Sequence, residues 1–295
     1  MRGQGQGLTE RARPANLVTD VLPLTGVFAL HLVFAFASGW LVVAAVTTVA
    51  DAKGTGRAGF LGGVPSTGAV SLLFIGWSQS QSAAVQATAV FPLAFSVTFA
   101  FLLFYSIPGR AAFGPRMAAA ILLWFVLAAV VALSGFDSFP STAVVAVLVS
   151  SGVFLAHRRL RIGDVRPARA GFDLERTVWR GALGGCVVTA VVVLSEAAGP
   201  LVGGAFAAAP AVWTSSLYVT SRAHGVQFSR SLTNSFMVTG ILTVIPYGVA
   251  ARLLFPVVGI WWGTLLSYVA MSPAAWLAWR LTRRRGEALA ETGPG

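Results

Sequence analysis

Long apolar runs, each about as long as a bilayer core is thick, dominate this chain. Uncharged stretches of about 20 residues recur between Val21 and Trp279. A helix needs about 20 apolar residues to cross a hydrocarbon core of about 30 Å. Backbone groups in lipid must be hydrogen-bonded within their own segment, so such runs can span only as helices. The sequence therefore predicts an all-α, polytopic transmembrane helical bundle.

The charge content supports a membrane protein and argues against a soluble one. Only 11% of the residues are charged and 56% are hydrophobic, with a mean hydropathy of +0.77. A soluble domain carries about 25% charged residues to cover its water-exposed surface. The net charge of +11 comes from arginines in short loops between apolar runs. We therefore attribute it to membrane topology and expect no nucleic acid as a partner.

Nine apolar segments are predicted to span the membrane, with boundaries uncertain by a few residues. The fifth of these segments, "STAVVAVLVSSGVFLA", is short but carries no charge. The predicted spans are residues 28–50, 59–77, 83–106, 115–134, 140–156, 180–196, 201–221, 231–251 and 257–279.

The distribution of basic residues predicts how the chain is oriented. With the N-terminus outside, 17 of the 21 lysines and arginines fall on the inner side, and only Arg2, Arg11, Arg13 and Arg252 lie outside. This predicts a multi-pass protein of the cell membrane with a cytoplasmic C-terminus. The three N-terminal arginines argue against it, since a tenth span within residues 16–50 would place them inside without moving any other loop.

The chain also matches itself at a fixed offset of 145 positions, which we call the repeat offset. "DAKGTGRAGFLGGVP" (51–65) falls on "EAAGPLVGGAFAAAP" (196–210), and nine of the 27 positions from 39 to 65 are identical. Glycine, proline, threonine and acidic residues keep this register over a long stretch. The pairs include Gly39 with Gly184, Asp51 with Glu196, Gly59 with Gly204, Pro65 with Pro210, Thr88 with Thr233, and Thr98 with Thr243.

The repeat divides the chain into two four-helix units and their connections. We expect an N-terminal tail and interfacial lead-in (1–32), the first unit (33–134), a linker helix with a basic cytoplasmic loop (135–177), the second unit (178–279) and a cytoplasmic tail (280–295). If the linker helix spans, five spans precede the second unit. Because five is odd, the second unit would be inverted, which is a common transporter architecture.

The second unit resembles a known family of small inner-membrane proteins. "GGAFAAAPAV" (203–212), "SRSLTNSFMVTGILTVIPY" and a tryptophan-rich fourth helix together look like the GlpM-like proteins. The resemblance implies four-helix chains that insert in both orientations and pair antiparallel, here fused into one chain of fixed orientation. The first unit departs from the pattern, because "IPY" has no counterpart and "SIPG" (106–109) lies further on. The resemblance implies an architecture rather than a substrate.

Two acidic residues, Asp51 and Glu196, end the first helix of each unit and are candidates for the transport path. They could form a pair of gate or proton-relay carboxylates related by the repeat. Alternatively, both are interfacial carboxylates, for which charge costs little. Only burial would shift their pKa values into a useful range.

The glycine and proline clusters of both units, with Gly59, Pro65, Gly204 and Pro210, are also candidates. A broken second helix would free backbone amides and a positive dipole end to hold a substrate or anion. The alternative is that small residues only let helices pack closely in lipid.

Polar residues gather on the second and third helices of each unit. Such groups at membrane depth are expected to face protein or a water-filled path. Hydrogen bonds between helices, worth about 0.6 kcal/mol each, are the alternative. The candidates are Gln86, Thr88, Ser231, Thr233 and Asn234.

The sequence contains no set of residues typical of an enzyme or cofactor site. Cys186 is the only cysteine, the three histidines are scattered, and no metal-ligand or nucleotide-binding pattern is present. We therefore expect no enzyme and no cofactor. A gradient-driven transporter or channel for a small solute is the first hypothesis, and a non-transporting scaffold or accessory subunit is the second. The expected partners are the lipid bilayer and a solute or coupling ion, while a homo-oligomer remains open.

Overall fold

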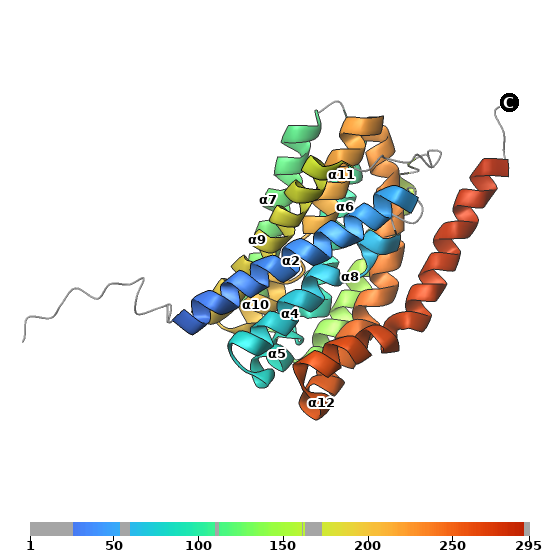
Figure 1. Cartoon of the computed structure of the whole chain (residues 1–295). Coiled ribbons are helices and arrows are strands. Elements are labelled where there is room, and N and C mark those ends of the chain that lie inside the picture. The colour runs from blue at the N-terminus through green and yellow to red at the C-terminus, as the bar shows by residue number, and fades with distance from the viewer. Residues whose placement is uncertain (1–25, 54–59, 110–111, 161, 163–172, 292–295) are drawn as a thin grey trace, which may run out of the picture.

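In the computed structural model, every regular element of the described residues is a helix (Figure 1). These residues are 26–53, 60–109, 112–160, 162 and 173–291, with side chains described over 26–49 and up to residue 282. A short helical stretch at 60–63 precedes α4. The helices are α2 (Gly26–Lys53), α4 (Ser66–Ser78), α5 (Gln81–Ala87), α6 (Phe91–Ser106), α7 (Phe113–Leu133), α8 (Phe139–Arg159), α9 (Leu174–Ala198), α10 (Pro200–Phe206), α11 (Ala211–His224) and α12 (Val226–Glu291).

Among the described residues, six helices are long and apolar enough to cross a membrane, with the stretch 60–63 and α4 counted together as one; the bent pair α5 and α6 makes seven if it counts as one span. The sequence predicted nine, and two features account for the difference between seven and nine. The expected span 201–221 is divided into α10 and α11, each too short alone. The expected spans 231–251 and 257–279 are joined in α12 without a connecting loop.

Helix α12 is interrupted at Gly259, although the sequence around it stays helical. Gly259 has φ 78° and ψ 171°, a backbone conformation that residues with a Cβ rarely adopt. In Figure 1 the chain turns at the bottom of the bundle, and the last part of α12 stands away from it. Gly259 thus separates two apolar segments that the sequence had predicted as two spans.

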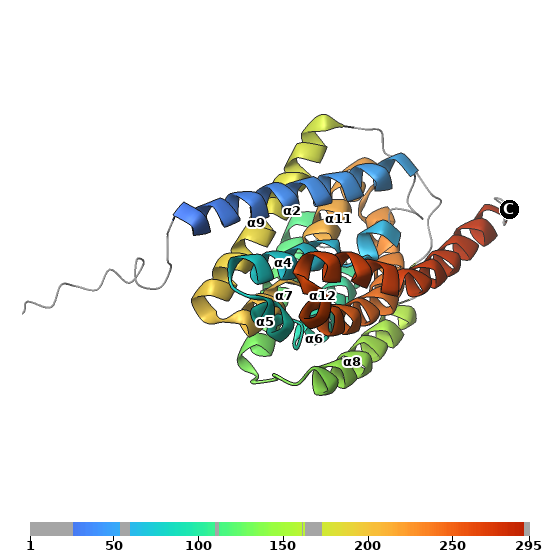
Figure 2. The same ribbon diagram turned by 60° about the horizontal axis from the view of Figure 1, so that its bottom comes forward.

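The bundle has two chemically different ends. At one of them, which we call the arginine end, α2, α6, α8 and α11 finish while α7, α9 and α12 begin. Thr48 and Thr177 hydroxyls approach to 3.4 Å there, and Arg230 Nη2 donates to the Gly109 carbonyl at 3.5 Å. At the opposite end, Gln79 Nε2 donates to Ser195 Oγ at 2.8 Å. Figure 2 shows the bundle with this opposite end turned toward the viewer.

Helices α2 and α9 pack against each other through glycines. A Cβ at Gly39 would lie 2.8 Å from the Gly184 carbonyl oxygen and 2.8 Å from Val188 Cγ2. A Cβ at Gly184 would lie 2.9 Å from the Gly39 oxygen and 2.3 Å from Val43 Cγ2. The contact is therefore reciprocal, and its partners are pairs at the repeat offset. Residue numbers rise along one helix as they fall along the other, so the two helices are antiparallel.

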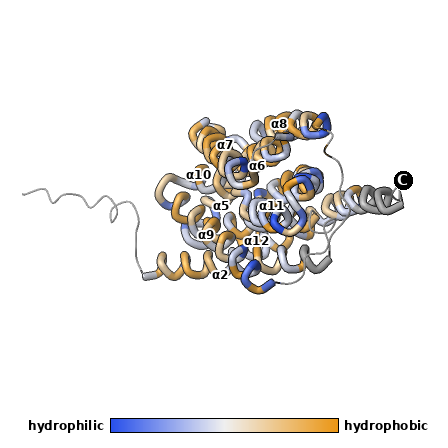
Figure 3. The backbone as a smooth tube through the Cα atoms, turned by 90° about the horizontal axis from the view of Figure 1, so that it is seen from above, coloured by the Kyte–Doolittle hydropathy of each residue, from blue (hydrophilic) through white to orange (hydrophobic). Residues whose placement is uncertain are grey.

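The outer helices carry an apolar surface suited to lipid. Large side chains such as Val33 on α2, Leu122 on α7, Leu148 on α8 and Val257 on α12 are exposed. Figure 3 shows hydrophobic colour along α2, α7 and α8. A water-soluble protein would not expose so much apolar surface. The long apolar helices are thus compatible with an integral membrane protein.

Helix α8, the expected linker, packs along α6 through small polar residues. Ser96 Oγ lies 3.1 Å from Ser150 Oγ and 3.2 Å from the Ala146 carbonyl, while Thr142 Oγ1 donates to the Ala89 carbonyl. Hydrogen bonds of this kind hold helices together where no water competes. The proposed unit boundaries themselves remain predictions.

Candidate substrate site at two helix breaks

Two helix breaks occur at the positions that the sequence marks with proline. The helical stretch 60–63 ends before Pro65, which precedes α4 with φ −73° and ψ 55°. Helix α10 ends at Phe206, and Pro210 precedes α11 with φ −79° and ψ 42°. Proline lacks an N–H and its ring crowds the preceding turn, so it favours a helix end or kink. The two breaks therefore share one geometry, and their prolines are a pair at the repeat offset.

Side chains from other helices bind the carbonyl groups that the breaks leave open. Thr98 Oγ1 donates to the Ala208 carbonyl at 2.8 Å, and Thr243 Oγ1 donates to the Gly63 carbonyl at 3.3 Å. The two donors are a pair at the repeat offset, and so are the two acceptors. The first break is therefore capped from α12 and the second from α6.

The residues that pack against the two breaks can also be compared at the repeat offset. Trp213 donates its Nε1–H to the Gly62 carbonyl at 2.6 Å and stacks on Phe236 at 5.8 Å. Gly68 of α4 is the residue that corresponds to Trp213 at the repeat offset, and it has no ring. The ring of Phe91 lies within 2.6 Å of the point where a Cβ of Gly68 would be. The large residue on α11 thus corresponds to a glycine on α4.

A small cavity of about 20 Å³ lies between the breaks. Both prolines line it, together with Ser66, Thr67 and residues of α6 and α11. Ser66 is 5% exposed, and its hydroxyl has no hydrogen-bond partner. A site of this size holds about one water molecule or one monatomic ion.

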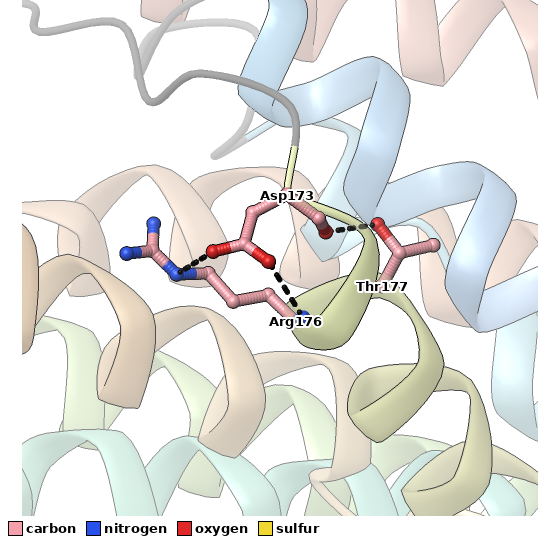
Figure 4. A network of polar contacts seen from close by, with 3 residues as sticks. All are labelled: Asp173, Arg176 and Thr177. Atoms are coloured by element: carbon pink, nitrogen blue, oxygen red, sulfur yellow. Dashed lines mark hydrogen bonds and ion pairs between the residues drawn. The ribbon is translucent and has the colours of Figure 1, made fainter.

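A larger cavity of about 580 Å³ opens at the arginine end between α7, α9 and α11. We call it the arginine vestibule, because Arg176, Arg180 and Arg222 line it together with Asp173, Glu175 and apolar residues. Asp173 caps α9 by accepting from the Arg176 amide at 3.2 Å, and its carboxylate pairs with the Arg176 side chain at 3.0 Å (Figure 4). The cap fixes the start of α9 beside the opening.

Aromatic side chains fill the equivalent place at the opposite end. We call this group the aromatic plug: it consists of His31, Phe34, Phe74, Trp77 and Trp261, with ring centroids 4.8–5.6 Å from that of Trp77. At the repeat offset, Trp77 corresponds to Arg222, and Phe34 corresponds to Trp179, another vestibule residue. The vestibule and the aromatic plug therefore contain residues that are pairs at the repeat offset, and Phe34 and Trp261 of the plug are about half exposed.

A buried polar cluster closes the bundle between α6, α8 and α12 at the arginine end. His157 Nε2 lies 2.8 Å from Thr233 Oγ1, and Ser106 Oγ donates to the same oxygen at 2.9 Å. Tyr105 is hydrogen-bonded to Ser229 close by. These contacts join three helices.

The two candidate carboxylates lie at opposite ends of the bundle. Asp51 is in the last turn of α2, and its side chain lies outside the described residues. Glu196 is half-buried near the end of α9, and its Oε2 atom is buried without a hydrogen-bond partner. Glu196 does not line the cavity at the breaks.

The glycine and proline candidates fall in different places. Pro65 and Pro210 are brought together at the small cavity. Gly204 packs α10 against α5, because a Cβ there would lie 2.2 Å from the Ala87 carbonyl oxygen. Gly59 lies outside the described residues.

The polar candidates do not form a single path. Gln86 is exposed and Asn234 half-buried, while Thr88 and Ser231 donate to carbonyls of their own helices at 2.6 and 2.7 Å. Arg252 Nη1 donates to the Val85 carbonyl at 3.2 Å and thereby caps the short helix α5. Thr233 belongs to the cluster around His157.

Sequence reasoning did not single out Ser66, Thr67 or Trp213 as site residues. Two of them directly follow Pro65 in "PST", and Trp213 follows Pro210 in "PAVW". A search for polar or aromatic residues in the first turn after each proline would have found them.

Comparison with known proteins places no relative beside this chain. The chain matches no protein-family model, no curated protein and no solved structure. Among the side chains that the structure describes, no group of three or more His, Cys, Asp or Glu residues could hold a metal ion.

Proposed function

We propose that the protein is a gradient-driven transporter or channel for a small solute, with its substrate site at the two helix breaks. One observation carries the proposal: both breaks face a common cavity that contains an unpartnered buried hydroxyl. Discontinuous helices that meet at such a site are a recurring feature of membrane transporters.

Two inverted four-helix units are part of the proposal. Helices α2 and α9 are equivalent at the repeat offset, and they contact each other reciprocally and antiparallel. A reciprocal contact is what a two-fold axis produces. If both helices span, their opposite directions imply opposite orientations of the two units. Nine passes result when α10 and α11 count as one span and α12 counts as two.

Alternating access is supported by the contrast between the arginine vestibule and the aromatic plug. Thr214 and Ser215 of α11 line the vestibule, and the adjacent residues Val212 and Trp213 line the small cavity. The vestibule therefore comes within one helical turn of the breaks, whereas the plug covers the equivalent approach. If the first unit took the open arrangement of the vestibule and the second unit took the closed arrangement of the plug, the site would open toward the opposite side of the membrane.

The proposed orientation has the arginine end in the cytoplasm. Basic residues near membrane-spanning helices stay predominantly in the cytoplasm. Because α2 begins at the end opposite the arginines, the N-terminus would lie outside. Arg252 lies at that opposite end, while the segments at the arginine end contain Arg116, Arg158, Arg159, Arg176, Arg180, Arg222 and Arg230.

A non-transporting scaffold is the second candidate, and the capped carbonyls favour it. Thr98, Thr243 and Trp213 satisfy the acceptors at the breaks, as a purely structural kink would require. The cavity of about 20 Å³ is also closed to most solutes in this conformation.

Flux into proteoliposomes separates the two candidates. We expect the parent protein to carry at least one small solute down its gradient. Gly68→Leu should abolish this flux, because a side chain at position 68 would meet the Phe91 ring and displace the groups packed around the breaks. Gly152→Leu is the matched control, because Gly152 is exposed on α8 with no atom within 4 Å of a Cβ. Asp51→Ala and Glu196→Ala, assayed beside the parent, test the carboxylates. Absence of flux for every ion and solute tried would favour the scaffold.

A further inference from the structure

The unused hydrogen-bonding groups at the breaks point to a small monovalent anion as the ligand of this site, and we propose that such an ion binds there. The inference rests on the proposed function, because it names the substrate class of the same site. It depends on three properties of the cavity: its donors, its size and its charge.

The carbonyl groups at the breaks are engaged by donors from the protein itself. The carbonyls of Val64 and Pro65 accept from Ser66 and Ala69, and those of Ala209 and Pro210 accept from Ala211 and Thr214. The carbonyls at 62, 63 and 208 accept from Trp213, Thr243 and Thr98. Each of these oxygen atoms thus already accepts a hydrogen bond, and a cation would have to share it with that donor.

Donors, by contrast, remain available at the cavity. The first turn of a helix leaves amide N–H groups without intrahelical partners. Here the amides of Thr67 and Gly68 on α4, and of Val212 and Trp213 on α11, belong to such turns, and these four residues line the cavity. Within the described part of the chain these amides have no backbone acceptor. Two helix N-termini therefore direct donors to one place.

Ser66 provides an independent sign of a missing partner. Its hydroxyl lines the cavity and makes no hydrogen bond, although the residue is only 5% exposed. A buried hydroxyl without a partner is destabilising, because it has lost its water and gained nothing in return. An anion in the cavity would accept this bond as well as those of the amides. Because the equivalent residue of α11 is Ala211, the hydroxyl comes from the first unit alone.

The size of the cavity and the charge around it further restrict which ligands could bind there. About 20 Å³ accommodates one atom of roughly the size of water and excludes sugars, amino acids and phosphate in this conformation. None of the residues that line the cavity is charged. The positive ends of α4 and α11 would therefore attract an anion without a neutralising side chain, and would weakly oppose a cation.

The test measures ion flux in proteoliposomes with chloride and bromide against gluconate, and with sodium and potassium. Ser66→Ala and Thr67→Val place in the first unit the residues that the second unit has at the equivalent positions, so both are small changes. Ala211→Ser is the reciprocal control. We expect flux of the small anions, and a reduction of about tenfold or more in Ser66→Ala, the size of a lost hydrogen bond to a charged group. Ala211→Ser should retain the flux.

A binding measurement keeps the two proposals distinguishable. Bromide at constant ionic strength, with gluconate as the balancing anion, should raise the unfolding temperature of the parent in detergent more than that of Ser66→Ala. Flux of a cation or an uncharged solute without anion flux would overturn the anion site and leave transport standing. Bromide stabilisation of the parent alone, without any flux, would overturn transport and support the anion site. Equal anion flux and equal stabilisation in the parent and Ser66→Ala would overturn the role of this cavity.

Discussion

One added methyl group at Gly184 tests how closely the two units are joined. In Gly184→Ala the new Cβ would lie 2.3 Å from Val43 Cγ2 and 2.9 Å from the Gly39 carbonyl oxygen. Ordinary carbon contacts begin at 3.4 Å, so the Val43 methyl group must retreat by about 1 Å. Because Val43 Cβ would itself lie only 2.6 Å away, the helix backbones must also shift apart. Val43 is completely buried, and overpacking of this kind costs about 1–3 kcal/mol.

Thermal unfolding in detergent, followed by circular dichroism, measures this cost. Gly152→Ala is the control, because nothing lies within 4 Å of its Cβ and alanine favours a helix by up to about 1 kcal/mol. Val43→Ala in the Gly184→Ala background should restore part of the loss, since it removes the nearer of the two obstacles. Val188→Ala should not, because Val188 faces Gly39 instead. In the Gly39→Ala background the roles of the two valines should exchange.

Two results would refute this account of the contact. If Gly184→Ala were as stable as Gly152→Ala, the helices would not be in the contact described. If both valine substitutions rescued Gly184→Ala equally, the helices would be separating as a whole. The expected coupling between positions 43 and 184 is of the order of 0.5–3 kcal/mol, as for residues in direct contact.

Three further changes probe the breaks, the plug and the polar cluster. Thr98→Val and Thr243→Val should each destabilise the protein by about 1–3 kcal/mol in thermal unfolding, since each leaves a buried carbonyl without its donor. Thr220→Val should change little, because the Thr220 hydroxyl donates to carbonyls of its own helix, α11. For the plug, a reporter cysteine is introduced as Leu73→Cys in a Cys186→Ala background. Trp77→Ala should increase the labelling of this cysteine by an impermeant maleimide, and unchanged labelling would contradict the plug. His157→Ala should lower the unfolding temperature more than His224→Ala, because His157 is 3% exposed and bridges to Thr233 while His224 is exposed; equal effects would deny the cluster a structural role.

The helical class was predictable from sequence, and a broken second helix was one of the two interpretations of the glycine and proline clusters. Apolar run length is a local property, and it predicted helices because lipid permits little else. Pro65 and Pro210 act on their own backbone, so their effect is also local. Gly259 could not be interpreted in the same way, because glycine continues or ends a helix according to its surroundings. The predicted pair of spans 231–251 and 257–279 therefore emerged as one helix with an internal break.

The polar contacts were less predictable, because they depend on which residues meet across the bundle. Thr88 and Ser231 had looked like parts of a water-filled path, yet both hydroxyls bond to their own helices. Thr98 and Thr243 carry no local signal that they cap a break more than a hundred positions away. Their shared register at the repeat offset was the one available clue. The resemblance to GlpM-like proteins stays a prediction.

Under the proposed repeat, the differences between equivalent positions become informative. The carbonyl caps are the same residue in both units, since Thr98 and Thr243 are both threonine. The donors are not the same, because Ser66 and Thr67 have Ala211 and Val212 as counterparts. Two identical chains around a two-fold axis would have to carry every hydroxyl twice in a cavity of about 20 Å³. A fused chain can carry one such set and keep the cavity small, so the asymmetry at the breaks is what a site for a single ion requires.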